Sequence, residues 1–185
     1  MNRPDQPVLN ITGEKVALGP LRRDLVPLYQ RWLNDFAVTR TLAAGRRPFT
    51  LEAEEDWFQQ ASRNAQDLVF TLYELATLRP IGNAGLHRVD HAHGTAEFGI
   101  FIGEQDCWGR GYGTEATRLV IDYGFDVLGL HNIWLRAFSD NLAGLRAYAR
   151  AGFREVGRLR EAHRRGRERY DVVLMDCLAV ERATR

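Results

Sequence analysis

Residues 100–116 read IFIGEQDCWGRGYGTEA, and this stretch decides the fold class. The apolar run Ile100–Ile102 is typical of a strand end, and a helical pattern begins directly after Gly113. Glycines at 109, 111 and 113 let the backbone turn tightly and approach a ligand without a Cβ atom in the way. The free amides of a helix start point outward and suit a phosphate or pyrophosphate group. The stretch therefore predicts an anion-binding strand–loop–helix, and we favour this over a turn that merely needs glycine.

The segments on either side predict a mixed α/β protein. Upstream, periodicity and turn residues indicate a strand at Lys15–Gly19, a helix with Leu25, Leu28, Tyr29, Trp32, Leu33 and Phe36 on one face, a loop at 41–48, a helix after Thr50, and strands at Leu68–Leu75, Ile81–Val89 and Ala96–Ile102. Turns near Arg79-Pro80 and at 90–94 join these strands into an antiparallel meander. Downstream they indicate a helix closed by Gly129, a strand at Asn132–Phe138, a helix at Asn141–Ala151, and strands near Arg154–Glu161 and Tyr170–Leu178.

Composition narrows the class of protein. The chain has 185 residues and a formal net charge of +1, from 25 basic and 24 acidic side chains, and 45% of it is hydrophobic. These values are typical of one globular domain. We expect that domain to span residues 1–185, with 1–14 as an N-terminal extension and 179–185 as a tail. The near-neutral charge gives no argument for a nucleic-acid or membrane-surface partner.

The sequence shows no clear pattern for a membrane span, a signal peptide or a metal site. No apolar run approaches the roughly 18 residues of a membrane span, and residues 1–10 lack a signal-peptide pattern. Cys107 and Cys177 lie 70 residues apart, which is neither a disulfide framework nor a metal signature. His87, His91 and His93 straddle a predicted strand end and turn, and no further ligand spacing completes a site. We expect a soluble, cytoplasmic protein without a bound metal.

Three other nucleotide-binding signatures can be compared with the glycine loop. Gly111 to Ala116 matches the dinucleotide fingerprint G-x-G-x-x-[GA], and Asp140 lies 24 residues further on, near the expected acidic position. However, the loop follows an antiparallel meander, where a doubly wound sheet would already be parallel. No lysine follows the glycines as a P-loop requires, and no kinase-type strand is present. A dinucleotide-dependent oxidoreductase stays a minor alternative.

Three ordered motifs resemble the GNAT family of N-acetyltransferases, particularly its ribosomal-protein alanine and spermidine acetyltransferase branch. The family signature [QR]-x-x-G-x-[GA] falls on Trp108 to Gly113, with tryptophan in place of the first residue. The segment from Asn141 to Phe153 resembles N-x-x-[AS]-x-x-x-Y-x-[KR]-x-G-F, and the closing strands are also similar. The resemblance runs from about residue 15 to 178. It implies a central mixed, mostly antiparallel sheet of six to seven strands, flanked by about four helices.

The resemblance also implies acetyl-CoA as co-substrate. In the family the pantetheine arm pairs with a strand, and the pyrophosphate lies on the glycine loop. The positions that match are Ile100, Phe101, Ile102, Trp108, Gly109, Arg110, Gly111, Tyr112, Gly113, Thr114 and Asn141. Asn141 also fits a helix N-cap, and one side chain can serve both roles.

Two residues match catalytic positions of the family. Tyr148 corresponds to a tyrosine that protonates the departing thiolate, which a phenol with a pKa near 10 can do at neutral pH. The alternative is a core tyrosine whose hydroxyl reaches solvent. Glu97 corresponds to a glutamate that some members use as a base through water. A glutamate on the solvated face, or one that organises nearby backbone, is an equal alternative.

The expected function is N-acetyl transfer to a primary amine by direct attack. A polyamine acceptor calls for acidic residues in the loop at 41–48, whereas this loop carries Arg46 and Arg47. This favours a small amine bearing a carboxylate, an antibiotic-like amine or a protein N-terminus over spermidine. The expected partners are acetyl-CoA and the amine, with neither membrane nor nucleic acid, and a homodimer stays open. A non-catalytic acyl-CoA sensor is the main alternative.

Overall fold

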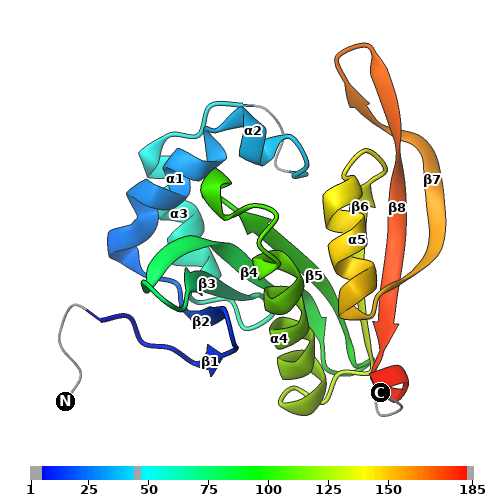
Figure 1. Ribbon diagram of the computed structural model, residues 1–185, viewed down its shortest axis with the longest axis horizontal. Helices are drawn as coiled ribbons and strands as arrows, with labels where there is room; N and C mark the ends of the chain where they lie inside the picture. The colour runs from blue at the N-terminus through cyan, green and yellow to red at the C-terminus, as the bar shows by residue number, and fades with distance from the viewer. Residues whose placement is uncertain (1–5, 44–46, 183–185) are drawn as a thin grey trace.

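The computed structural model describes residues 6–43 and 47–182, and its centre is a single eight-stranded sheet (Figure 1). Along the sheet the strand order is β1-β2-β3-β4-β5-β6-β8-β7. The strands are β1 (Ile11–Thr12), β2 (Val16–Pro20), β3 (Leu68–Glu74), β4 (Arg79–Asp90), β5 (Thr95–Ile102), β6 (Asn132–Phe138), β7 (Arg154–Arg165) and β8 (Glu168–Leu178). All neighbours are antiparallel except β5 and β6.

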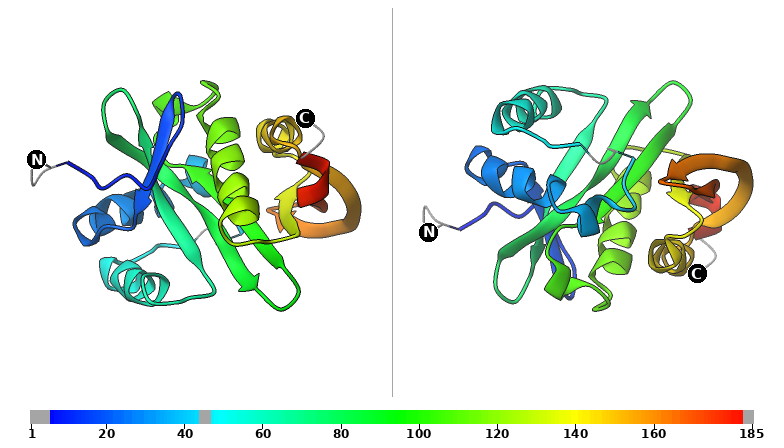
Figure 2. Two further views of the ribbon diagram at one scale, coloured as in Figure 1. Left: turned by 90° about the horizontal axis from the view of Figure 1, so that it is seen from below. Right: turned by 90° about the horizontal axis from the view of Figure 1, so that it is seen from above.

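Helices cover both faces of this sheet (Figure 2). On one face lie α1 (Val26–Leu33), α2 (Phe36–Thr39) and α3 (Leu51–Ala61), which connect β2 to β3. On the other face lie α4 (Tyr112–Asp126) and α5 (Leu142–Ala151). The remaining helical turns are η1 (Arg23–Leu25), η2 (Gln105–Cys107) and α6 (Ala179–Arg182).

Alternation along β5 divides the interior into two cores. Ile100 and Ile102 pack into the larger core together with Val120 of α4. Phe101 points to the opposite face, as the period of a strand requires, and its ring lies 6.0 Å from that of Trp32 on α1. The end of β5 therefore contributes side chains to both cores.

The parallel pairing of β5 with β6 is short, and this positions the site. It covers only Thr95–Glu97 against Asn132–Trp134, after which the two strands diverge (Figure 1). On its other side β5 stays paired with β4 as far as Ile102. Strand geometry turns every second N–H and C=O of β5 toward β6. Residues 98–102 thus present backbone groups that lack a strand partner on that side, and a wedge opens between β5 and β6.

Several elements differ from the sequence prediction. The sheet has eight strands rather than six to seven, because β1, inside the expected extension, pairs with β2 through Ile11 opposite Leu18. The single helix expected up to Phe36 is interrupted, because the Asp35 side chain accepts a hydrogen bond from Ala37 N and starts α2. Phe36 then points outward, with 53% of its surface exposed.

Two turns differ in their exact position from the prediction. The turn predicted near Arg79-Pro80 occupies residues 75–78, directly before these two residues, which begin β4; it contains Leu78 at φ 57°. The closing hairpin has longer strands than predicted, so its turn is confined to Gly166 and Arg167. Among the helices of residues 6–43 and 47–182, none combines the length and the apolar character needed to cross a membrane.

Candidate active site

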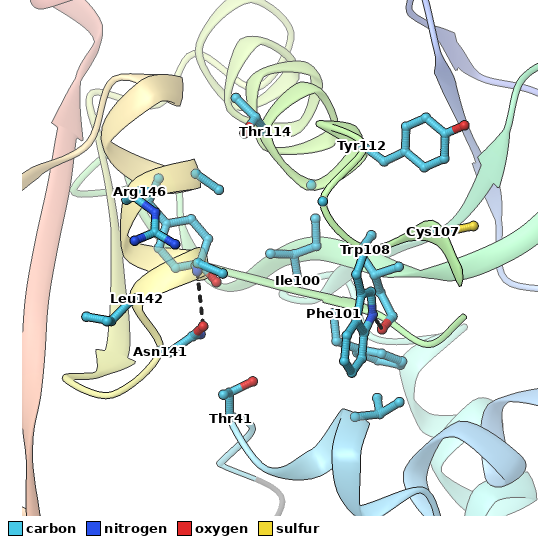
Figure 3. A pocket seen from close by; sticks show the side chains of 18 of the residues that line it. Thr41, Ile100, Phe101, Cys107, Trp108, Tyr112, Thr114, Asn141, Leu142 and Arg146 are labelled. Carbon is cyan, nitrogen blue, oxygen red and sulfur yellow. Dashed lines mark hydrogen bonds between the residues drawn. The ribbon is translucent and has the colours of Figure 1, made fainter. Parts of the chain in front are cut away.

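The wedge between β5 and β6 leads into a cavity of about 560 Å³ that both faces of the sheet help to line (Figure 3). Its walls come from four segments that are far apart in sequence: the α2 end, β5, the glycine loop and the face of α5. The lining residues are Ala37, Val38, Arg40, Thr41, Leu42, Ile100, Phe101, Ile102, Cys107, Trp108, Gly109, Gly111, Tyr112, Gly113, Thr114, Asp140, Asn141, Leu142, Ala143, Gly144, Arg146, Ala147, Tyr148 and Arg150.

The glycine loop presents free amides to the cavity. Gly109 and Gly111 adopt φ values of 74° and 84°, in the left-handed region that favours glycine. The helical hydrogen bonds of α4 begin with Glu115 N to Gly111 O at 3.1 Å, so the preceding amides are not used by the helix. A Cβ atom at Gly113 would meet no protein atom within 4 Å. The loop therefore leaves open space where an anion can approach the helix start.

Trp108 holds the strand end beside this loop. Its indole Nε1 donates a hydrogen bond to the Ile102 carbonyl at 3.0 Å, while 44% of the residue's surface stays exposed. Tryptophan replaces the glutamine or arginine of the family motif at this position, and its indole N–H is thus the hydrogen-bond donor to the edge of β5. The backbone groups of β5 that lack a strand partner on this side therefore begin at Phe98 and end at Ile102, whose carbonyl accepts from Trp108.

The α5 face forms the opposite wall (Figure 3). Asn141 caps the helix, because its Oδ1 accepts from Gly144 N at 3.0 Å, and the same side chain lines the cavity. A Cβ at Gly144 would lie 2.4 Å from Asn141 Nδ2, so any larger residue here would force the capping side chain of Asn141 to shift. Arg146 and Arg150 line the cavity one helical turn apart. The cap and the two guanidiniums place polar donors along the whole face.

Tyr148 also faces the cavity from α5. Its ring packs edge-on against Phe98 of β5 at 6.1 Å and against Phe153 at 6.3 Å. Burial raises the pKa of its hydroxyl to about 12, so the phenol is protonated throughout the neutral range. Among the described residues the hydroxyl makes no hydrogen bond. A proton donor without a protein partner therefore stands in the wall of the cavity.

Glu97 and Arg110 are not brought to the cavity. Glu97 is only 14% exposed in its side chain and accepts contacts from Arg88 at 3.0 Å and Arg136 at 2.8 Å. These contacts tie β4, β5 and β6 together just below the point where the wedge opens. Arg110 points away from the cavity and lies 3.6 Å from Glu74.

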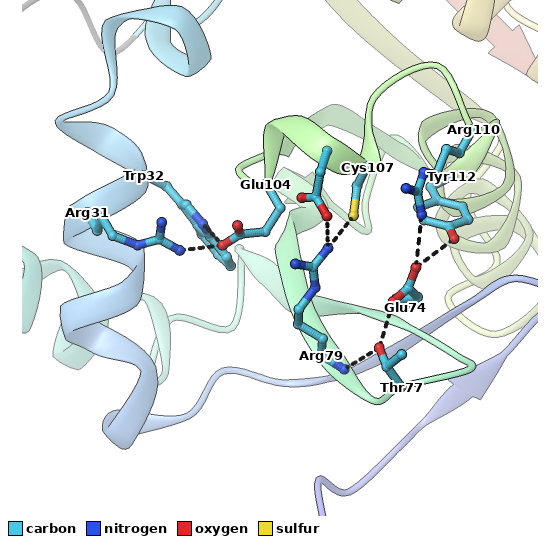
Figure 4. A network of polar contacts seen from close by, with 10 residues as sticks. Arg31, Trp32, Glu74, Thr77, Arg79, Glu104, Cys107, Arg110 and Tyr112 are labelled. Carbon is cyan, nitrogen blue, oxygen red and sulfur yellow. Dashed lines mark hydrogen bonds and ion pairs between the residues drawn. The ribbon is translucent and has the colours of Figure 1, made fainter.

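A polar network behind the glycine loop was missed by sequence reasoning (Figure 4). Glu74 accepts from Tyr112 Oη at 2.8 Å and from Thr77 Oγ1 at 2.6 Å, and these bonds lower the pKa of its carboxyl. Arg79 binds Asp106 at 2.6 Å and the Cys107 sulfur at 3.0 Å. The network fixes both ends of the loop from its outer side. No local pattern marks it, because apart from the Glu74–Thr77 contact its partners lie 27 to 38 residues apart.

Of the remaining residues that the sequence analysis named, those that the structure describes lie outside the cavity. Arg46 lies outside the described residues, and the guanidinium of Arg47 lies over the Phe49 ring at 5.0 Å rather than in the cavity. His87 and His93 each pair with an aspartate. Among the described residues, no three His, Cys, Asp or Glu side chains gather in a way that could hold a metal ion.

Comparison with known proteins gives a family for this arrangement. The family model described as "Acetyltransferase (GNAT) domain" matches residues 15–154. The uncharacterized N-acetyltransferase p20 of Bacillus licheniformis is 30% identical over 114 residues, which is 62% of this chain and 64% of that protein. The spermidine N(1)-acetyltransferase of Escherichia coli K12 is 36% identical over 78 residues, 42% of this chain and 41% of its own length. The aligned parts thus span less than two thirds of these relatives.

Solved structures share the fold. The spermidine N-acetyltransferase from Vibrio cholerae in complex with CoA and spermine superposes with a TM-score of 0.83 at 23% identity, covering 91% of this chain and 98% of that one. A GNAT-family acetyltransferase from Bacillus anthracis superposes with a TM-score of 0.79 at 20% identity, covering 92% and 98%. At these identities the likeness concerns the fold alone.

Proposed function

Because the chain belongs to the GNAT family of acetyltransferases, we propose that it moves an acetyl group from acetyl-CoA to a primary amine. One observation carries the proposal. The unpaired edge of β5, the amides at the start of α4 and the Tyr148 hydroxyl all face a single cavity. Acetyl-CoA would use all three: the extended pantetheine arm would pair with the strand edge, the pyrophosphate would bind the helix amides, and the departing sulfur would take a proton from the hydroxyl.

The residues present fit acetyl-CoA. The amides from Gly111 to Thr114 suit the pyrophosphate, and the open space at Gly109 and Gly113 leaves room for it. Arg146 and Arg150 on the facing helix add positive charge. The backbone of residues 98–101 can pair with the amide groups of an extended arm, since amide pairing is how a strand edge recognises a peptide-like chain. We therefore assign the α4 and α5 face to the cofactor.

The thioester supplies the acyl group: a nitrogen–carbon bond forms, the carbon–sulfur bond breaks, and one proton passes overall from the amine to the sulfur. Tyr148 is placed to deliver that proton as a general acid, and it regains one from the acylated nitrogen through solvent. A free amide on the β5 edge is placed to stabilise the negative charge on the carbonyl oxygen. The amine reaches the wedge from the α2 side, which the cofactor leaves open.

We assign Glu97 a structural role in this scheme. Its carboxylate already accepts from Arg88 and Arg136, and it does not line the cavity. A base would need a path to the amine, whereas this carboxylate is held against the neighbouring strands. A small amine can be deprotonated by solvent before it binds, so the reaction does not depend on Glu97.

A thiol-release assay tests the proposal. Purified protein, acetyl-CoA and a panel of small amines, polyamines and peptides are mixed, and free CoA is measured together with the mass of the acetylated product. We expect release with at least one amine and none when the amine is omitted. Tight acetyl-CoA binding with no release across the whole panel would instead support the acyl-CoA sensor.

A further inference from the structure

Two arginines share one carboxylate at the α2 end of the cavity. Arg165, at the end of β7, binds Asp140 through Nη1 and, at 3.3 Å, through Nη2, and it donates to the Arg40 carbonyl at 2.8 Å. The Arg40 guanidinium approaches the same carboxylate, with 3.3 Å between Nη2 and Oδ2. The cluster joins the end of α2, the β6–α5 turn and the hairpin tip.

Arg165 neutralises Asp140. Both side chains are only 12% exposed, and the hydrogen bonds from Arg165 hold the pKa of Asp140 below its usual value. The Arg165 guanidinium also lies 4.9 Å from the centre of the Tyr170 ring. The terminal N–H groups of Arg165 thus bind partners within the protein. The negative charge of Asp140 is balanced by Arg165 and is a weak site for a cationic ligand.

Arg40 is in a different position. Its side chain is 55% exposed and lines the cavity, and its one hydrogen bond, at 3.3 Å, is at the long end of the range. A guanidinium carries five N–H donors in a fixed fork. Among the described residues the other donors of Arg40 have no partner. Arg40 can therefore bind a planar carboxylate inside the cavity.

The other charges of the cavity support this assignment. Among the described residues, the charged side chains that line it are Arg40, Asp140, Arg146 and Arg150. Arg150 lies at the α4 end, where Arg118 of α4 donates to its carbonyl at 2.7 Å. Arg146 lies further along α5 than Asn141 (Figure 3), so among the described residues the α2 end is left with Arg40 and a carboxylate that Arg165 already balances. Two guanidiniums around one carboxylate give the described groups at this end a net positive charge, which favours an anion over a polyamine.

We propose that the acceptor is an amine that carries a carboxylate, and that Arg40 binds this carboxylate while the amine faces the wedge. The proposal rests on the proposed acetyl transfer and names its substrate class. The shared chemistry is an amino group and a carboxylate in one molecule, found in free amino acids and at the acidic N-terminus of a peptide.

Matched acceptors test the proposal in the thiol-release assay. Each pair differs only in a carboxylate and its amide: glycine and glycinamide, β-alanine and β-alaninamide, glutamate and glutamine, and peptides with Glu or Gln at their second position. We expect kcat/KM to be at least about tenfold higher for the acid member of one pair, mainly through KM. Free amino acids and peptides form separate arms, so the preferred arm identifies the source.

Variants of Arg40 give the matched control. Arg40→Gln should raise the KM for the preferred acid about tenfold or more and leave its kcat and the KM of the amide unchanged. Arg164→Gln removes an exposed arginine of the same hairpin that is outside the cavity, and it should change neither constant. Equal loss in both variants would mean that general surface charge, not Arg40, sets the preference, which overturns the proposal.

A measurement of acceptor binding without turnover tests the role of Arg40 independently of the proposed acetyl transfer. Saturation-transfer NMR on the CoA-loaded protein compares the same acids and amides without turnover. Stronger binding of an acid, lost in Arg40→Gln, supports the proposal even if no amine is acetylated, in which case only the proposed reaction fails. Equal binding of acid and amide in every pair, or turnover with spermidine above every acid, overturns it.

Discussion

The indole N–H of Trp108 donates to the carbonyl of Ile102 across 3.0 Å, and this bond joins the glycine loop to the end of β5. It marks where the free backbone edge of the strand stops and the anion-binding amides begin. Trp108 therefore joins the two halves of the proposed cofactor site directly, in addition to the network that holds the loop from its outer side.

Replacing that donor should weaken cofactor binding. Trp108→Phe keeps an aromatic ring but removes the N–H, so the Ile102 carbonyl loses its partner and the loop is less fixed. We expect the Kd for acetyl-CoA, measured by calorimetry, to rise about three- to tenfold, because one such bond contributes about 0.5–1.5 kcal/mol. Trp108→Gln can restore a donor and should bind better than the phenylalanine variant. Equal affinity of Trp108→Phe and the parent protein would contradict this role.

Removal of the Tyr148 hydroxyl should slow the chemistry alone. Tyr148→Phe retains the packing against Phe98 and Phe153, so we expect an unchanged Kd for acetyl-CoA and unchanged thermal stability. Without the proton donor, kcat should fall by about a hundredfold or more. Single-turnover kinetics with a verified amine provide the measurement. An undiminished kcat would rule out the acid role.

The pH profile gives a second measure of Tyr148. Its pKa is raised to about 12, so the acid form persists far above neutrality. The kcat of the parent protein should accordingly show no decline from this group between about pH 7 and about pH 10. A decline centred near pH 10, the ordinary phenol value, would show that the hydroxyl is hydrated during turnover.

Substitutions at two glycines, each with open space around its Cα, can distinguish an effect on ligand binding from an effect on stability. A Cβ meets no protein atom within 4 Å at either Gly113, in the first turn of α4, or Gly157, on β7. Gly113→Ala should preserve or raise stability, since alanine favours a helix by about 1 kcal/mol over glycine. It should nevertheless raise the Kd for acetyl-CoA about tenfold, because the methyl enters the ligand space. Gly157→Ala is the control and should bind normally.

Glu97→Gln distinguishes a structural carboxylate from a base. The substitution removes the charge that Arg88 and Arg136 share, so the free energy of unfolding should fall by about 1 kcal/mol in denaturant melts. We expect kcat to remain within about twofold, because Glu97 is outside the cavity. A large loss of kcat with intact stability would restore the catalytic interpretation.

Glu54 makes the stability of the protein depend on pH. This residue of α3 is only 3% exposed, and burial raises its pKa from 4.5 to about 7. The folded protein therefore retains a proton that the unfolded chain releases, and its stability falls as the pH rises from about 4.5 to about 7. Glu54→Gln should stabilise the protein at about pH 8, by up to about 3 kcal/mol, and have little effect at about pH 4. Urea melts at both values provide the check.

Local features of the chain were predictable from the sequence. The strand Asn132–Phe138 was predicted with its observed bounds, and α5 runs to Ala151 as expected, with Gly152 ending it at φ 119°. The glycine loop before α4 also lies where the motif predicted. These features depend on hydrophobic periodicity and on backbone angles that only certain residues adopt, and both are properties of neighbouring residues.

The sequence by itself determined the mixed α/β class, the glycine loop and the family. The tertiary structure alone decided that β5 and β6 separate after three paired positions, which makes the wedge. It also decided that Glu97 binds two arginines outside the cavity, and that Arg40 and Arg165 meet at Asp140. Arg40 and Asp140 lie 100 residues apart. Contacts over such distances depend on the strand order of the whole sheet, which no local pattern contains.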